Sequence, residues 1–198
     1  CESSIKINNN TPIMKTRDAI FIHDAVNVVF LLPFAFMCLM EVVFHYTIHP
    51  LFLTYALISH MSYDLLWIYL QPQIITSFRR LIVIHHLTAL SLLVYPLLDP
   101  QDARLTAISG IIEFDTSLLL LRRIYNGNKR MYDKFNRMYL ISNMVLRVYY
   151  ESLLTVTFWY YFEYANFWVR LHIMSGQVFI NLFSYGICIR NQLKRVRA

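Results

Sequence analysis

The feature of this sequence that most restricts its fold is a pair of long apolar segments that ionisable side chains interrupt. The segments cover residues 79–98 and 103–123, and each is close to the roughly 20 residues that a helix needs to cross a bilayer. His85 and His86 interrupt the first segment, and Glu113 interrupts the second. A charge at membrane depth costs about 2.5–3.5 kcal/mol on insertion scales, so such residues are candidates for a functional site.

The whole chain has the composition of a membrane protein. Of its 198 residues, 57% are hydrophobic and 15% are charged, whereas a soluble domain carries about 25% charged residues. Hydropathy predicts six membrane-spanning helices, at residues 20–47, 51–71, 79–98, 103–123, 138–162 and 166–189. The predicted fold is therefore an all-α integral membrane protein, with a polar tail at residues 1–18 and one six-helix bundle at residues 19–198.

The positive charges predict the orientation, because Lys and Arg gather in cytosolic loops. Fifteen of the 18 Lys and Arg residues fall on one side of the predicted topology. They lie in the N-terminal tail, at 79–80, at 122–137 and at 190–197. Arg104 lies on the other side, and Arg147 and Arg170 lie within predicted spans. We expect both termini in the cytosol, and we read the net charge of +6 as a topology signal rather than as a nucleic-acid-binding surface.

The polar side chains inside the predicted spans lie at similar depths. At 1.5 Å per helical residue, they are roughly 8–14 Å from the cytosolic ends of their helices. The set comprises Asp64, His85, His86, Glu113, Arg147 and Asn181. Five helices thus place polar groups in one layer, which predicts a shared site that forms the polar floor of a lipid cavity.

Helical phase assigns some of these residues to faces, because residues three or four apart share a face. His85 aligns with Thr88, and Glu113 aligns with Thr116. Two other ionisable residues point away from these faces, His86 by roughly 100° from His85 and Asp115 by roughly 160° from its own helix's stripe. We expect those two side chains to contact adjacent helices, whereas His85 is expected to meet the lipid. Polar stripes of this kind also act as interhelical contacts in membrane bundles, which is the structural alternative.

The order of these polar motifs resembles the TLC domain family, which includes the ceramide synthases. The motifs are Tyr-Asp at 63–64, His-His-Leu-Thr at 85–88, Glu-x-Asp-Thr at 113–116 followed by Arg122, Arg147 in the fifth span, and Asn-Leu-Phe at 181–183. The resemblance covers about residues 19–195 and implies a lipid-handling protein of the endoplasmic reticulum. Ceramide synthases transfer a fatty acyl group from acyl-CoA to a sphingoid-base amine, using adjacent histidines and a His-Asp motif. The sequence IIEFDTSLLLLRR replaces that second motif here and looks more like the TLC-domain-containing proteins outside the ceramide synthase branch.

The residues are chemically suited to such a reaction. An imidazole that a carboxylate orients can act as a general base or as a nucleophile toward an acyl group. The candidate catalytic residues are His85, His86, Glu113 and Asp64, and the candidate substrate-binding residues are Asp115, Thr116, Thr88, Arg147, Asn181 and Arg122. No metal is expected, since the three cysteines Cys1, Cys38 and Cys188 are scattered, and acyl-CoA would enter as a substrate.

Three functions remain open on the sequence. The first is acyl transfer between acyl-CoA and an amine or hydroxyl, and the second is non-catalytic lipid binding that regulates membrane composition. The third is a haem-binding redox protein, which is disfavoured because adjacent histidines cannot face one iron. The expected partner is a fatty acyl lipid, and a homo-oligomer is compatible with the sequence.

Overall fold

The protein, seen in a computed structural model, consists of helices throughout residues 16–45, 48–74 and 78–196, the part of the chain that the structure describes. Most of the predicted polar tail, residues 1–15, lies outside this part, as do the side chains beyond Arg190. The α-helices are α1 (Thr16–Phe44), α2 (Pro50–Leu70), α3 (Arg79–Leu92), α4 (Val94–Leu98), α5 (Ala103–Gly110), α6 (Glu113–Ile124), α7 (Lys129–Ser142), α8 (Glu151–Tyr161) and α9 (Phe167–Val196). A π-helix, η4 (Asn143–Tyr150), joins α7 to α8, and short 3-10 turns occupy Pro72–Ile74, Pro100–Asp102 and Tyr125–Gly127.

Four helical segments are long and apolar enough to cross a membrane. They are Arg17–Phe44 in α1, Pro50–Leu70 in α2, Arg79–Leu98 across α3 and α4, and Phe167–Arg190 in α9. The other two predicted spans are also helical, but 103–123 is divided between α5 and α6, and 138–162 runs from α7 through η4 into α8. The prediction of an all-helical chain with membrane-length helices is confirmed.

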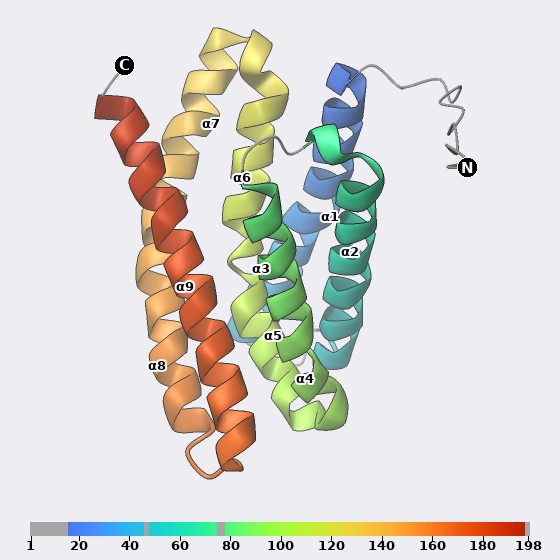
Figure 1. Ribbon diagram of the computed structural model, residues 1–198, viewed down its shortest axis with the longest axis vertical. Coiled ribbons are helices and arrows are strands. Elements are labelled where there is room, and N and C mark those ends of the chain that lie inside the picture. Colours follow the sequence, from blue (N-terminus) through green and yellow to red (C-terminus); the bar gives the residue numbers. More distant parts are fainter. Residues whose placement is uncertain (1–15, 46–47, 75–77, 197–198) are drawn as a thin grey trace, which may run out of the picture.

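The long helices run side by side along the longest axis of the molecule (Figure 1). The start of α1, the end of α9 and the turn between α6 and α7 lie at one end of the bundle (Figure 1). The turn between α8 and α9 lies at the opposite end, together with the region where α4 meets α5 (Figure 1). Helix α3 contacts α2 on one side and α9 on the other.

Local backbone chemistry explains the interrupted helices. Pro96 lies in α4 and has no backbone N–H, so it cannot donate to the preceding turn, where α3 ends. Between α5 and α6 the backbone forms tighter bonds three residues back, from Ile112 N to the Ser109 carbonyl (3.2 Å) and from Asp115 N to the Ile112 carbonyl (3.0 Å). The second break places Glu113 at the first position of α6.

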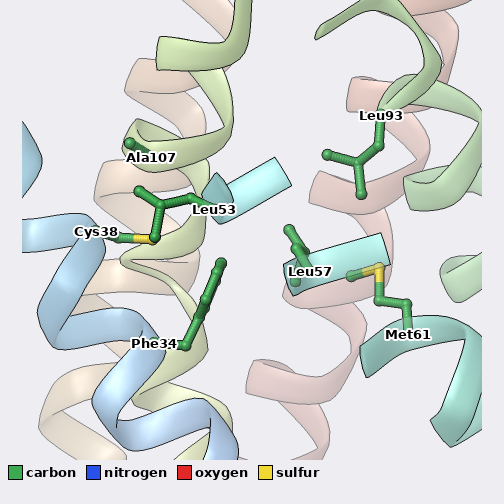
Figure 2. Close-up of a cluster of buried hydrophobic side chains, with 7 residues drawn as sticks. All are labelled: Phe34, Cys38, Leu53, Leu57, Met61, Leu93 and Ala107. Carbon is green, nitrogen blue, oxygen red and sulfur yellow. The ribbon is translucent and has the colours of Figure 1, made fainter. Parts of the chain in front are cut away.

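The main hydrophobic core joins α1, α2 and α5 (Figure 2). It contains Phe34, Cys38, Leu53, Leu57, Met61, Leu93 and Ala107. Gly110 lets α1 pack closely against the end of α5, because a Cβ atom there would lie 2.5 Å from Cys38 Sγ and 2.9 Å from Phe34 Cε1. Outside this core, large apolar side chains such as Val29, Leu98 and Tyr149 are at least 71% exposed, as expected for a surface that faces lipid.

Candidate functional site

A partly open pocket of about 120 Å³, which we call the cavity, is lined by residues of α2, α3, α4, α5, α6, η4, α8 and α9. Its polar lining comes mainly from one region of the bundle, where His85, Glu113, Arg147, Glu151 and Gln177 meet. The remainder is largely apolar, with lining residues such as Leu92, Leu105, Leu154, Phe158, Phe162 and Ile173. The cavity is therefore an apolar space with a polar wall.

The side chains of the adjacent residues His85 and His86 lie in different environments. His85 lines the cavity, and its ring stacks on Phe183 with a centroid distance of 4.7 Å. His86 instead donates from Nδ1 to the Ile82 carbonyl (2.8 Å), and its Nε2 lies 3.3 Å from Asp64 Oδ2 on α2. The prediction that His85 and His86 diverge, with His86 contacting an adjacent helix, is confirmed.

Arg147 organises the polar side of the cavity from the π-helix. Its Nη2 donates to Thr116 Oγ1 (2.7 Å), and its Nε lies 3.4 Å from Asp115 Oδ2. Asn143 donates to the same Asp115 oxygen (3.1 Å). Asp115 thus contacts a neighbouring helical segment, as its phase predicted. Single π-helical turns inside α-helices are frequent at functional sites, because they change the direction in which side chains project.

Several buried polar atoms around Arg147 have no hydrogen-bond partner among the described residues. They are His85 Nδ1, Asp115 Oδ1 and both carboxylate oxygens of Glu151. An unsatisfied buried polar group costs about 1–3 kcal/mol, and such groups call for an explanation such as a bound ligand or ordered water. We refer to His85, Glu113, Asp115, Arg147 and Glu151 as the Arg147 cluster.

A second polar group, which we call the His23 network, connects α1, α2, α3 and α6. It comprises His23, Asp24, Asn27, Asp64, His86 and Arg123. His23 Nδ1 lies 3.1 Å from Asp24 Oδ1, and His23 Nε2 lies 2.8 Å from Asp64 Oδ1. Each ring nitrogen therefore faces a carboxylate oxygen, so His23 connects Asp24 to Asp64.

The outer oxygens of the two carboxylates are paired as well. Arg123 Nε lies 3.1 Å from Asp24 Oδ2, and His86 Nε2 lies 3.3 Å from Asp64 Oδ2. Asn27 Nδ2 also donates a hydrogen bond of 3.0 Å to Asp64 Oδ1. Asp64 contacts α1 through His23 and Asn27 and α3 through His86. Of the residues predicted to share one polar layer, Asp64 and His86 therefore lie in the His23 network, whereas His85, Glu113 and Arg147 line the cavity.

The remaining candidates are spread around these two groups. Asn181 donates to Thr155 Oγ1 and is buried on α9 with Gln177 and Ser184. Thr88 is half-buried on α3, and its carbonyl accepts a hydrogen bond from Ser91 (2.7 Å). Neither Thr88 nor Asn181 is a lining residue of the cavity.

Arg122 does not line the cavity. Its Nη1 donates to Asn136 Oδ1 on α7 (3.0 Å), and its guanidinium lies 4.6 Å from the centroid of the Tyr139 ring. It therefore joins α6 to α7 near the turn between them. In the described part of the chain, no group of three or more His, Cys, Asp or Glu residues is arranged to hold a metal ion.

Sequence reasoning missed His23, Asp24 and Asn27. Their signal is a His-Asp-x-x-Asn pattern, which places His23 and Asn27 on one face of α1. The predicted span 20–47 places His23 close to its first residue, but α1 begins at Thr16. His23 consequently lies roughly 10 Å inside the helix and is only 5% exposed.

The fold defines a class, namely all-helical proteins with helices long and apolar enough to cross a membrane. Comparisons with protein-family models, with curated proteins and with solved structures find no match for this chain.

Proposed function

We propose that this protein belongs to the lipid-handling membrane proteins and binds one fatty acyl chain in its cavity. The observation that carries the proposal is the composition of the cavity wall, in which His85, Glu113 and Arg147 lie beside an otherwise largely apolar lining. Such a lining matches an amphiphile, whose tail excludes water and whose head needs hydrogen bonds. The unpartnered atoms of His85 and Glu151 supply that capacity.

The proposal includes six membrane spans with both termini in the cytosol, in the endoplasmic reticulum. The pair α5 and α6 covers 103–124, which at 1.5 Å per residue is about 30 Å, the thickness of the hydrocarbon core. The Lys and Arg residues of the α6–α7 turn lie at the same end of the bundle as the start of α1 (Figure 1). This gathering of positive charge supports a cytosolic position for that end.

Entry of a long acyl chain requires the cavity to enlarge. Its volume of about 120 Å³ is below that of the roughly 150 Å³ apolar cavity that accepts benzene in another protein. Helix α3 forms one wall of the cavity and contains no buried residue. We therefore propose that α3 moves outward between α2 and α9 to admit the chain from the lipid.

The chemical version of the proposal is acyl transfer through His85. Its imidazole would attack the thioester carbonyl of acyl-CoA, forming an acyl-imidazole and releasing the CoA thiol. An amine or hydroxyl would then take the acyl group, and the imidazole would be regenerated. Glu113 lines the same cavity and would accept the proton that the amine or hydroxyl loses when it takes the acyl group.

A second candidate is a non-catalytic lipid-binding regulator. It is favoured by the position of Asp64, which lies 3.3 Å from His86 rather than beside His85. His85 Nδ1 has no hydrogen-bond partner in the described part of the chain, so no carboxylate orients the imidazole in this conformation. In this version the polar wall holds a lipid headgroup and no bond is formed.

Blocking the cavity tests lipid binding. Ala89 lines the cavity from α3, so Ala89→Trp should fill it and abolish the lipid that copurifies with the protein, measured by mass spectrometry. Leu87→Trp is the matched control, because Leu87 is on the same helix but 54% exposed. Equal lipid content in both variants would contradict the proposal.

A turnover assay separates the two versions. The purified protein is incubated with acyl-CoA and candidate amine or hydroxyl acceptors, and released CoA thiol is measured. His85→Ala should retain the bound lipid and lose thiol release, while His172→Ala, whose ring contacts Tyr95 at 2.7 Å, should retain both. Lipid binding without thiol release in the native protein would leave the non-catalytic regulator as the better account.

A further inference from the structure

A second hollow lies on the outer surface of the bundle and is distinct from the cavity. It is an apolar groove of about 820 Å³ formed by α1, α6, α7 and the start of η4. Its lining includes Phe36, Leu39, Phe114, Leu118, Met138 and Ile141. These large side chains remain open to the outside, with Phe36 62% and Ile141 67% exposed. The volume is within the roughly 300–1,000 Å³ of ordinary ligand pockets.

The face of α7 that lines this groove becomes basic toward the α6–α7 turn. Arg130, Lys134 and Met138 are spaced four residues apart, and Ile141 follows three residues later, so all four share one face of the helix. Arg130 and Lys134 are exposed. Neither forms an ion pair with any residue that the structure describes. At 1.5 Å per residue, Lys134 lies about 6 Å above the start of the groove lining.

The charge and the groove together point to one kind of occupant. The α6–α7 turn lies at the end of the bundle that carries the start of α1 (Figure 1), which is the cytosolic end in the topology proposed above. The cytoplasmic leaflet carries anionic lipids, which attract Lys and Arg close to the membrane surface. An apolar groove directly below two unpaired cations is complementary to a molecule with an anionic head and a fatty acyl chain.

We propose that this groove is a binding site for an anionic phospholipid of the cytosolic leaflet. One acyl chain lies in the groove between α1, α6 and α7, and Arg130 and Lys134 bind the phosphate-containing headgroup. The site is separate from the cavity of the proposed function, since His85 and Glu113 take no part in it. The bound phospholipid occupies a fixed position and is not chemically changed.

The test uses the full chain in detergent micelles with phosphatidylserine or phosphatidylcholine of identical acyl chains. Binding is measured by native mass spectrometry, and the melting temperature is followed in parallel. The native protein should bind phosphatidylserine in preference to phosphatidylcholine. The double variant Arg130→Gln/Lys134→Gln should bind phosphatidylserine roughly 30-fold more weakly, since each cation contributes about a factor of five.

The matched control removes two other exposed positive charges. Arg80 lies on α3, and Lys129 lies about 180° around α7 from Met138, so Arg80→Gln/Lys129→Gln should keep the phosphatidylserine preference. A third variant, Ile141→Trp, fills the groove without changing any charge and should weaken binding while the melting temperature without lipid stays near that of the native protein. This variant separates the acyl-chain contact from the headgroup contact.

Three results would overturn the proposal. Equal binding of the two lipids would show that charge does not select the occupant. An equal loss in both double variants would show a general electrostatic attraction rather than a site. A dimer that Ile141→Trp converts to a monomer, with lipid binding unchanged, would assign the groove to a second copy of the chain.

Discussion

The His23 network and the Arg147 cluster both contain acidic and basic side chains, yet they differ in how completely their carboxylates are paired. In the His23 network all four carboxylate oxygens of Asp24 and Asp64 have a partner within 3.3 Å. In the Arg147 cluster, Asp115 has one unpartnered oxygen, and Glu151 has two.

This difference suggests a structural role for the His23 network and a ligand-binding role for the Arg147 cluster. A buried network whose carboxylates are all paired stabilises one arrangement of its helices, whereas carboxylates without partners retain hydrogen-bonding capacity for another molecule. We interpret the His23 network as the support that fixes α1, α2, α3 and α6 relative to one another. The Arg147 cluster is then the group that keeps unpartnered polar atoms for the proposed ligand.

The largest effect is expected for Asp64→Ala. The substitution leaves His23 and His86 without their shared carboxylate, and breaking a buried pair costs about 3–5 kcal/mol. The melting temperature in detergent, followed by intrinsic fluorescence, should fall sharply. Asp133→Ala is the control, because Asp133 is exposed on α7, and similar melting temperatures for the two variants would refute the supporting role of the network.

A smaller loss is expected for Gly110→Ala, which disturbs the contact between α1 and the helix pair that carries Glu113. The added Cβ would lie 2.5 Å from Cys38 Sγ, and overpacking of this kind costs about 1–3 kcal/mol. Gly186→Ala on α9 meets no atom within 4 Å and should be neutral or stabilise by up to about 1 kcal/mol through helix propensity. Thermal unfolding of both variants measures the difference, and a stable Gly110→Ala protein would mean that α1 can shift without cost.

The adjacent histidines should respond differently to removal. His86→Ala leaves Asp64 Oδ2 without its partner on α3, so it should cost about 1–3 kcal/mol. His85→Ala removes a stacking contact with Phe183, which is worth about 0.5–1.5 kcal/mol, and should therefore lower the melting temperature less. The reverse order would indicate that His85 belongs to the supporting network.

The smallest effect is expected for Glu151→Gln. The amide preserves the size of the side chain and removes a buried charge whose oxygens lack hydrogen-bond partners in the described residues, so stability should stay within about 1 kcal/mol of the native value or rise. Chemical denaturation of the variant, with lipid removed, provides the measurement. A loss as large as that of Asp64→Ala would show that Glu151 is paired in solution.

The sequence predicts the helical class, the positions of the helical segments and the faces of individual helices, because these depend on hydropathy and on a 3.6-residue period. It places His85 and His86 on different sides of α3 and directs Asp115 toward a neighbour. It does not predict that Asp64 and Arg147 belong to separate groups, since helical phase is a property of one helix and carries no information about which helices meet. The same limit explains why the contact of Arg122 with Asn136 on α7 was not predicted.

The breaks in the helices were also not predicted from the sequence. Pro96 marks one of them directly, but the break at Ile111 and Ile112 and the π-helix that carries Arg147 contain no proline. The pattern of apolar residues contains no signal for either of them.

The placement of His85 and His86 on successive residues of α3 has a thermodynamic consequence. One ring lines the cavity and the other lies beside Asp64, so a rigid shift of α3 changes both environments at once. Any molecule that binds the shifted helix more tightly must therefore weaken the contact of His86 with Asp64, and strengthening that contact must weaken the molecule's binding by the same factor. Binding of a molecule in the cavity and the contact of His86 with Asp64 are therefore thermodynamically linked. Substitutions at Asp64 should change lipid affinity although Asp64 does not line the cavity.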